Sequence, residues 1–160
     1  MRKLHFLIAL FVIVLDRLAK LVVEHKIPLH DGIQIIPGFF RLTHLENRGA
    51  AFGLFADSPS PWKIGALVLF SVIALVVVSA LLWKNSHTIS ITGIGLALIL
   101  GGAVGNLWDR LTTGHVIDFL LFYVGRYQWP AFNVADSAIV IGSGLLLVSL
   151  LRPKQQTAGA

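Results

Sequence analysis

The chain has 160 residues and a net charge of +5, with 56% hydrophobic and only 13% charged residues. Soluble domains carry about 25% charged residues, so this composition excludes an ordinary soluble domain and predicts a single integral membrane domain over residues 1–160. The basic residues flank apolar segments, where membrane topology and lipid headgroups account for them, and we expect no nucleic acid partner. The absence of cysteine excludes disulfides, thiolate metal sites and a cysteine nucleophile.

Four apolar segments approach the roughly 20 residues that a helix needs to cross a bilayer. They cover about residues 4–23, 63–83, 89–107 and 133–151. The first follows Arg2 and Lys3, as in a signal peptide, but no small-residue cleavage site follows it and Asp16, Arg17 and Lys20 interrupt it. We therefore predict a retained helix and, as fold class, an all-α membrane protein with four transmembrane helices.

The stretch between the first two helices, "GIQIIPGFFRLTHLENRGAAFGLF", has β-branched and aromatic residues between proline and glycine breaks. This pattern predicts short strands, so we expect a small extracytoplasmic β-like region there. The side of the membrane on which this region lies follows from the short basic segments that flank the helices. If the four helices alternate in direction, these flanks all lie on the same side. The positive-inside rule places these flanks, and both termini, in the cytoplasm. The flanking residues are Arg2, Lys3, Lys84, Arg152 and Lys154.

Four of the eight acidic residues lie within or against apolar segments: Asp16, Asp109, Asp118 and Asp136. A charge at a helix centre costs about 2.5–3.5 kcal/mol on insertion scales, so each needs a partner, a wet cavity or a function. Asp16 and Lys20, at i and i+4, predict an ion pair within the first helix. Asn106, Asp109 and Arg110 share one face of the third helix, and we favour an interfacial charge pair between Asp109 and Arg110 that supports the structure.

Asp136 and Asp118 raise a different question. Asn133 is a good N-cap, and Asp136 at the third helical position suits the positive end of the helix dipole. Capping alone would explain Asp136 if Asp118 were absent. Asp118, however, has no adjacent basic residue and sits within "HVIDFLLFYV". The topology brings Asp109, Asp118 and Asp136 to one membrane face.

Two carboxylates that converge in a partly dry site share a proton, because both cannot easily ionise. That state suits peptide hydrolysis: the ionised carboxylate takes a proton from water while the protonated one binds the scissile carbonyl. Such chemistry needs no cofactor. The sequence has no HExxH motif, and its six histidines lack metal-ligand spacing, so we expect no metal.

Four blocks resemble the bacterial lipoprotein signal peptidases, also called signal peptidase II or prolipoprotein signal peptidases. They are "LDRLAK" at 15–20, "NRGAAFG" at 47–53, "GGAVGNLWDRLTTGHVIDF" at 101–119 and "FNVADSA" at 132–138. Each block is weak alone, but their order on four predicted helices is specific. The family more often has Asn-Thr-Gly and Asp-Gln where this chain has Asn47-Arg48-Gly49 and Asp16-Arg17, and neither departure touches Asp118 or Asp136.

The resemblance implies an aspartic endopeptidase that cleaves before a diacylglyceryl-modified cysteine, at the outer face of the bacterial cytoplasmic (inner) membrane. Its partners would be lipid-modified prolipoproteins and membrane lipids. The implied catalytic pair is Asp118 and Asp136. The implied supporting residues are Asn47, Asn106, Asp109, Arg110 and Asn133, with a structural role for Asp16 and Lys20. We also expect an aromatic clamp over the substrate, formed by Phe39, Phe40, Phe52 and Phe55.

Two other functions remain open at this point. A small ion or proton transporter would use Asp16, Asp118 and Asp136 as a relay, but a transporter should place acids along a path through the bilayer, and here three of four crowd one edge. A non-catalytic assembly factor would tolerate carboxamides in place of Asp118 and Asp136.

Overall fold

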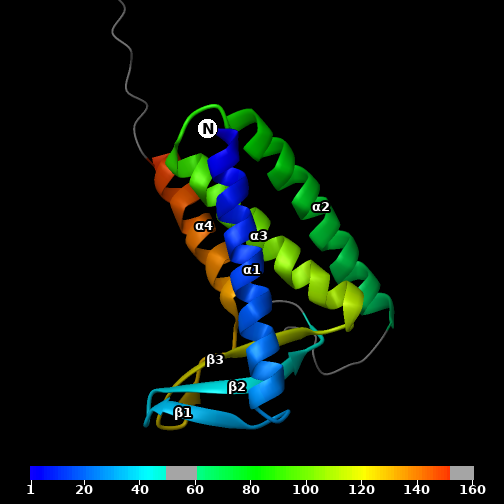
Figure 1. Ribbon diagram of the computed structural model, residues 1–160, viewed down its shortest axis with the longest axis vertical. Coiled ribbons are helices and arrows are strands. Elements are labelled where there is room, and N and C mark those ends of the chain that lie inside the picture. Colours follow the sequence, from blue (N-terminus) through cyan, green and yellow to red (C-terminus); the bar gives the residue numbers. More distant parts are fainter. Residues whose placement is uncertain (50–60, 152–160) are drawn as a thin grey trace, which may run out of the picture.

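The computed structural model describes residues 1–49 and 61–151 of the chain. Its four helices are α1 (Arg2–Lys26), α2 (Pro61–Asn85), α3 (Ile91–Thr112) and α4 (Val134–Leu151). They run side by side as a bundle in Figure 1. The predicted helices are confirmed as helices, but α3 ends at Thr112 instead of about 107. It continues because no helix breaker precedes Gly114, whose φ of 77° ends the segment.

Helix α3 is the centre of the bundle and contacts α1, α2 and α4, the last most extensively. Small residues allow this close packing. Gly101 lies against the backbone of Ala9 in α1, and Gly95 lies against the backbone of Gly142 in α4. Two glycines of the glycine-rich third segment are therefore points where the central helix contacts its neighbours.

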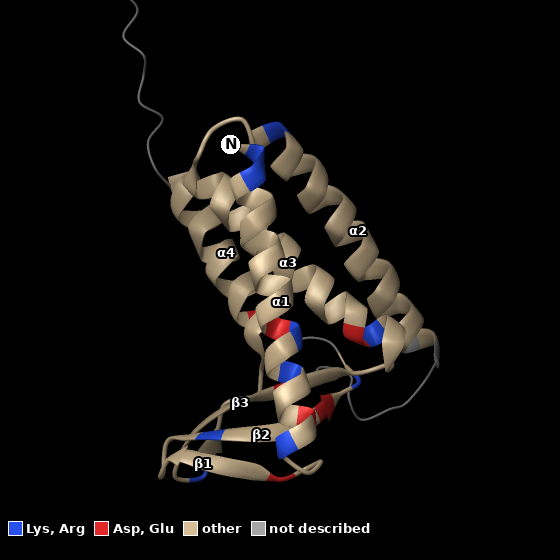
Figure 2. Ribbon diagram, in the orientation of Figure 1, with Lys and Arg blue, Asp and Glu red and all other residues tan. Residues whose placement is uncertain are grey.

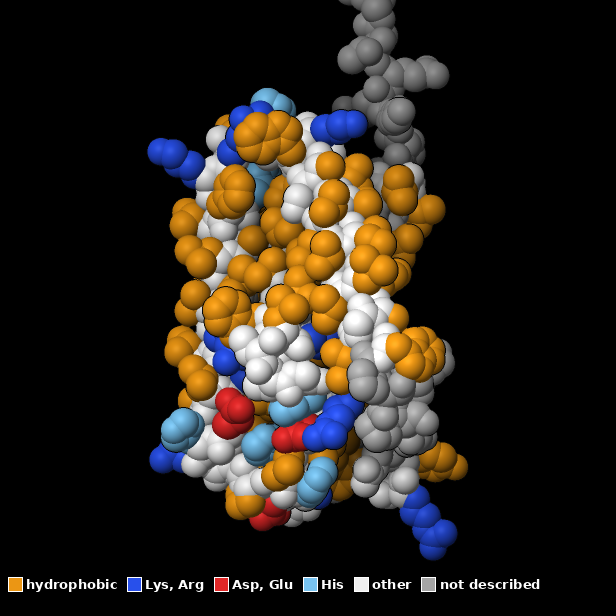
Figure 3. Space-filling model, turned by 90° about the vertical axis from the view of Figure 1, so that its right-hand side faces the viewer, with side chains coloured by type: hydrophobic (Ala, Val, Ile, Leu, Met, Phe, Trp, Pro, Cys, Tyr) orange, Lys and Arg blue, Asp and Glu red, His pale blue; other side chains and the backbone are white. Residues whose placement is uncertain are grey.

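Three helices, α2, α3 and α4, are long and apolar enough to cross a membrane, as judged by length and composition. Helix α1 differs because Asp16, Arg17 and Lys20 lie in its second half. On the face shown in Figure 3, hydrophobic side chains form a broad belt across the middle of the molecule, and most charged side chains lie toward its two ends. This distribution is that of a protein whose bundle sits in lipid and whose ends meet water.

A four-stranded antiparallel sheet covers one end of the bundle (Figure 1). Its strands are β1 (Gly32–Ile36), β2 (Phe40–Asn47), β3 (Val116–Val124) and β4 (Tyr127–Gln128), in that order across the sheet. The strands predicted between the first two helices are confirmed as β1 and β2. The sequence reading missed β3 and β4, which come from the segment between α3 and α4.

The pairing of β2 with β3 brings two distant parts of the sequence together. Asn47, at the end of β2, pairs with Val116 at the start of β3, and Leu45 pairs with Asp118. Asp118 therefore lies on a strand beside the last residues of β2. This register places its side chain next to that of Asn47, at the junction of sheet and bundle.

The contact between Gly95 and Gly142 predicts a sharp difference between two glycines of α4. An alanine Cβ at Gly142 would lie 2.5 Å from the Gly95 carbonyl oxygen, whereas one at Gly144 would meet nothing within 4 Å. We expect Gly142→Ala to destabilise the protein by about 1–3 kcal/mol, as overpacking does. Gly144→Ala should be neutral or stabilising because alanine favours helix. Thermal unfolding in detergent measures both, and equal midpoints would contradict this packing.

Candidate active site

Strand β3 positions Asp118, whose side chain is buried with 3% of the residue exposed. Its two carboxylate oxygens accept hydrogen bonds from two different asparagine amides. The Asn47 Nδ2 donates to Oδ2 over 2.9 Å, and the Asn133 Nδ2 donates to Oδ1 over 2.8 Å. These donors come from the end of β2 and the start of α4, so the site forms only when the sheet docks on the bundle.

Asp136 lies in the first turn of α4 and forms a reciprocal cap with Asn133. The Asn133 Oδ1 accepts from the Asp136 backbone N at 2.9 Å, and the Asn133 backbone N approaches Asp136 Oδ2 at 3.4 Å. This is the arrangement of a capping box, and it confirms the predicted cap. The Asp136 Oδ1 accepts a second, shorter bond of 2.7 Å from the Asn106 Nδ2 of α3.

Asn133 joins the two carboxylates because one side chain contacts both. Its amide nitrogen binds Asp118 while its amide oxygen caps the backbone of Asp136, and the residue is fully buried. Burial raises the pKa of Asp118 from 3.8 to about 7, with the nearby charge of Asp136 as the next cause. The structure thus places a carboxyl whose pKa lies near neutral pH close to a second carboxyl.

Behind the two carboxylates, α1 contributes a buried ammonium group. Lys20 Nζ lies 2.6 Å from Asp16 Oδ2 and 2.6 Å from Asp109 Oδ2, and it donates to Asn106 Oδ1 over 3.2 Å. The predicted ion pair between Asp16 and Lys20 is confirmed. Asp16 Oδ1 also accepts from the Ala135 backbone N of α4 at 3.0 Å. Lys20 therefore turns the Asn106 amide so that its nitrogen faces Asp136.

The predicted pair between Asp109 and Arg110 is wrong. Asp109 instead forms ion pairs with Arg17 and Lys20 of α1. Arg110 donates to the carbonyls of Gly49 and Asn106, over 3.2 and 3.5 Å. Successive residues on a helix point about 100° apart, so neighbours in sequence face different partners. Arg17 is the residue that the sequence reading missed, because nothing in the sequence shows which face of α1 meets α3.

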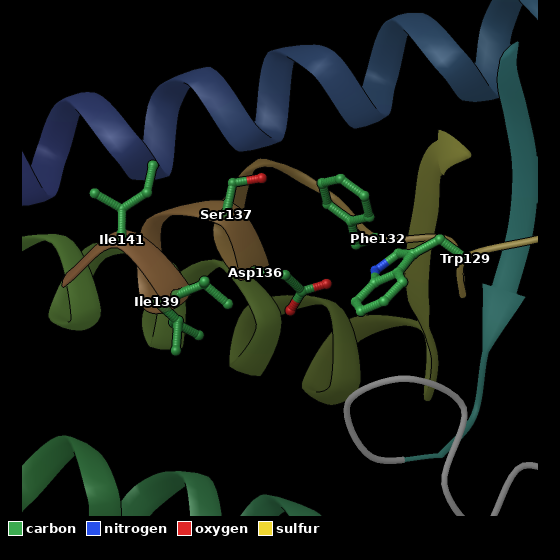
Figure 4. A pocket seen from close by; sticks show the side chains of 7 residues that line it. Trp129, Phe132, Asp136, Ser137, Ile139 and Ile141 are labelled. Carbon is green, nitrogen blue, oxygen red and sulfur yellow. The ribbon is translucent and has the colours of Figure 1, made fainter. Parts of the chain in front are cut away.

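Two apolar cavities open beside Asp136. One of about 480 Å³ is lined by Trp129, Phe132 and the first turns of α4, and Figure 4 shows the Asp136 carboxylate and the Trp129 ring within it. The other, of about 300 Å³, lies between α2 and α3 and also reaches Asn47, Asn106 and Arg110. The carboxylate is therefore accessible to a long apolar ligand from either side.

Of the residues expected to form an aromatic clamp, Phe52 and Phe55 lie outside the described residues. Phe39 and Phe40 both pack on Phe122, with ring centroids 5.3 and 4.8 Å away. Phe122 in turn stacks on Phe132 at 5.9 Å, and Phe132 lines the larger cavity. The hairpin between β1 and β2 thus adjoins the cavity through a chain of rings.

The chemistry of these groups is that of a pair of carboxyls, without obvious metal ligands. Within residues 1–49 and 61–151, no group of three or more His, Cys, Asp or Glu side chains is arranged to hold a metal ion. A protonated carboxyl beside an ionised one can bind a carbonyl oxygen and activate water.

The buried Lys20 predicts a large effect of removing one charge. Lys20→Met would leave the carboxylates of Asp16 and Asp109 buried with their common partner gone, which costs about 3–5 kcal/mol. Lys26→Met removes the same charge from an exposed position on the same helix and should change stability little. Thermal unfolding of both variants in detergent measures the difference. A Lys20→Met protein as stable as the control would show that the ammonium does not hold the cluster.

Comparison with known proteins agrees with this geometry. Residues 8–152 match the family model described as signal peptidase (SPase) II. A lipoprotein signal peptidase of Solibacter usitatus is 48% identical over 151 residues, covering 94% of this chain and 92% of that protein. One of Desulforapulum autotrophicum is 49% identical over 140 residues, covering 85% of this chain and 84% of that protein.

Solved structures are similar over nearly the whole chain. A bacterial membrane enzyme determined by the in meso method at 2.3 Å resolution superposes with a TM-score of 0.86 at 28% identity, covering 99% of this chain and 93% of that one. A second bacterial membrane enzyme, at 1.9 Å, gives 0.82 at 31% identity with 94% coverage of each chain. The family inferred from the four sequence blocks is confirmed: this chain belongs to the signal peptidase II family.

Proposed function

We propose that this protein is a membrane aspartic endopeptidase that removes signal peptides from diacylglyceryl-modified prolipoproteins by cleaving before the lipidated cysteine. The contact that carries the proposal is the Asn133 side chain, which binds Asp118 and caps the backbone of Asp136. Membership of the signal peptidase II family supports the same activity. Residues 1–160 would then form one integral membrane peptidase domain.

In the proposed reaction, Asp136 is the base and Asp118 the acid. Asp136 is assigned the base because its carboxylate accepts from the Asn106 amide and lies at the N-terminus of α4. Asp118 is assigned the acid because its pKa of about 7 leaves it about half protonated at neutral pH. The Asp136 carboxylate takes a proton from water as the water oxygen attacks the scissile carbonyl carbon, and Asp118 protonates the carbonyl oxygen. Collapse of the tetrahedral intermediate breaks the C–N bond, and the proton on Asp136 passes to the leaving amine of the lipidated cysteine. One hydroxyl of the intermediate returns its proton to Asp118, which restores the acid, and the signal peptide leaves as a carboxylic acid that ionises in water.

The supporting residues hold the carboxyls of Asp118 and Asp136 in position. Asn47, Asn106 and Asn133 hold the carboxylates by their amides. Arg110 lines the cavity between α2 and α3 and donates to the Gly49 carbonyl, so it would orient the substrate. Asp16, Lys20 and Asp109 form the buried charge cluster behind Asn106 and serve structure.

The two apolar cavities beside Asp136 suit a substrate that is both peptide and lipid. Acyl chains would lie along helix surfaces and the signal peptide would occupy the other side of the carboxylate. The proposed partners are therefore lipid-modified prolipoproteins and membrane lipids, with no role for nucleic acid.

For the topology, we propose that all four helices cross the bacterial inner membrane, with both termini in the cytoplasm and the active site near the outer face. The ribbon in Figure 2 has Lys and Arg positions at the end of the bundle where α1 begins and α2 ends, whereas the acidic positions, with further basic ones, lie toward the sheet. Arg2, Lys3 and Lys84 supply the basic side chains, as the positive-inside rule requires of a cytoplasmic end. This arrangement also disfavours a proton transporter, because the described acids form no path through the bundle.

Replacing either carboxylate separates a peptidase from a transporter or an assembly factor. Asp118→Asn and Asp136→Asn should each lower kcat/KM for a lipidated prolipoprotein in detergent by at least about 100-fold, because a group that transfers protons is lost. Asp31→Asn makes the same change at an exposed position in the loop before β1 and should leave the rate unchanged. Near-normal cleavage by either of the first two variants would rule out the pair as catalyst.

The pKa of Asp118 predicts the alkaline side of the pH–rate profile. Since the acid must carry a proton, kcat/KM should fall above about pH 7. The Asn47 amide favours the charged form of Asp118 and lowers its pKa, so Asn47→Ala should move this decline to higher pH while also reducing the maximum. Asn85→Ala, at the far end of α2, should leave the profile unchanged. A decline at the same pH in Asn47→Ala would refute the assignment of the acid to Asp118.

A further inference from the structure

His5 is fully buried near the start of α1, at the end of the bundle opposite the carboxylates. From residue 5 to Asp16 the helix rises about 16 Å. Neither ring nitrogen of His5 has a hydrogen-bond partner within the described part of the chain. A buried polar group without a partner is costly. The proposed peptidase reaction makes no use of His5. A hydrogen-bond partner for its imidazole would therefore be a group that enters the cavity next to it.

A cavity of about 110 Å³ is lined by both His5 and Arg2. Three contacts hold the Arg2 guanidinium. Its Nε donates to Ser86 Oγ over 3.2 Å, its Nη2 lies 3.2 Å from His87 Nε2, and its Cζ lies 4.0 Å from the centre of the Trp83 ring. The two hydrogen bonds use two of the five N–H donors of a guanidinium. Arg2 therefore offers further donors in a fixed position.

Helix α3 supplies the wall behind His5. An added Cβ on Gly93 would lie 2.5 Å from His5 Nε2, so only glycine lets the imidazole pack against the first turn of this helix. The turn begins with Ser90, whose side chain accepts from the Gly93 backbone N at 3.0 Å. The N-terminal end of a helix carries a partial positive charge. The imidazole thus lies between a positive helix end and the Arg2 cavity.

The charge around this cavity is positive. No carboxylate is among the described residues that line it. Lys3 and Lys84 lie next to the lining residues in sequence, and among the described residues in Figure 2 the charged positions coloured at this end of the bundle are basic. In Figure 3, Lys and Arg side chains gather there with a histidine, above the hydrophobic belt. The complement of such a site is an anion that accepts several hydrogen bonds.

We propose that this cavity binds the phosphate group of a membrane phospholipid headgroup, held by Arg2 and His5. The phosphate oxygens accept from the remaining guanidinium donors and from an imidazole N–H, which gives His5 its missing partner. A lipid is favoured over free phosphate because the rim is apolar and exposed: Phe6 and Trp83 are each 58% exposed beside the cavity. Aromatic residues in such positions mark the level of lipid headgroups.

The test uses the full-length protein, stripped of lipid in a neutral detergent and in phosphate-free buffer. Phosphatidylglycerol, diacylglycerol and inorganic phosphate are added separately, and the unfolding midpoint and the lipid retained in native mass spectrometry are measured. We expect phosphatidylglycerol to raise the midpoint and to remain bound, and diacylglycerol, which lacks the phosphate, to do neither. If inorganic phosphate alone stabilises the protein as much as the lipid does, the proposal that the bound phosphate belongs to a lipid is wrong.

Two variants, Arg2→Gln and His5→Leu, and the control Lys3→Gln test whether phosphatidylglycerol binds in this cavity. Arg2→Gln should weaken phosphatidylglycerol binding at least roughly tenfold, because a charge-assisted contact is lost. Lys3→Gln removes the same charge one residue away, from an exposed side chain, and should retain most of the affinity.

The variant His5→Leu distinguishes a histidine that binds lipid from one that only supports the fold. Without lipid the variant should unfold at the same temperature as the wild type or higher, because an unpartnered polar group is replaced by an apolar one. With phosphatidylglycerol it should lose most of the stabilisation. Destabilisation of His5→Leu in the absence of lipid, or equal lipid binding by Arg2→Gln, Lys3→Gln and the wild type, would overturn the proposal.

Discussion

The buried ammonium of Lys20 is the contact on which the rest of this structure depends. It lies between the carboxylates of Asp16 and Asp109 and binds the Asn106 amide. Through these groups α1 is fixed to α3, and through Asp16, which accepts from the Ala135 backbone, also to α4. A buried ion cluster contributes little to net stability compared with apolar packing, but it permits few alternative arrangements. Its function here is therefore positional, because it sets the height of the α4 N-terminus and the direction of the Asn106 amide.

That positioning brings together two carboxyls from different elements, and a pair of neighbouring carboxyls can share a proton and act as acid and base. Asp118 comes from a strand, is 3% exposed, and has a pKa near 7 because burial disfavours its charge. Asp136 comes from a helix N-terminus, where backbone N–H groups favour a negative charge. Asn133 contacts both, so the distance between the two carboxyls is set by one rigid amide and by the cap of α4.

The sequence predicted those features that depend on local spacing. A bilayer requires long apolar helices, so hydropathy located all four, and the pairs Asp16–Lys20 and Asn133–Asp136 follow from helix periodicity. It could not predict contacts made across the fold. Asn47 and Asp118 meet although 71 residues separate them, because β2 pairs with a strand that lies beyond two helices. Likewise, Asp109 faces Arg17 instead of its neighbour Arg110, since the rotation of α1 against α3 depends on the packing of Gly101 on Ala9.

Helix α1 shows why composition alone underestimates what can lie in a membrane. Asp16, Arg17 and Lys20 interrupt its apolar sequence, yet Asp16 and Lys20 are fully buried and form an ion pair inside the bundle. The side chains that α1 exposes at this level, including Leu15 and Leu18, are apolar. Lipid therefore meets a hydrocarbon surface, and the cost of a charge in a bilayer applies only to side chains that face the lipid. On this argument we include α1 among the membrane-crossing helices of the proposed topology. Helix α1, the least hydrophobic of the four, is then the helix that supplies the Lys20 ammonium behind the active site.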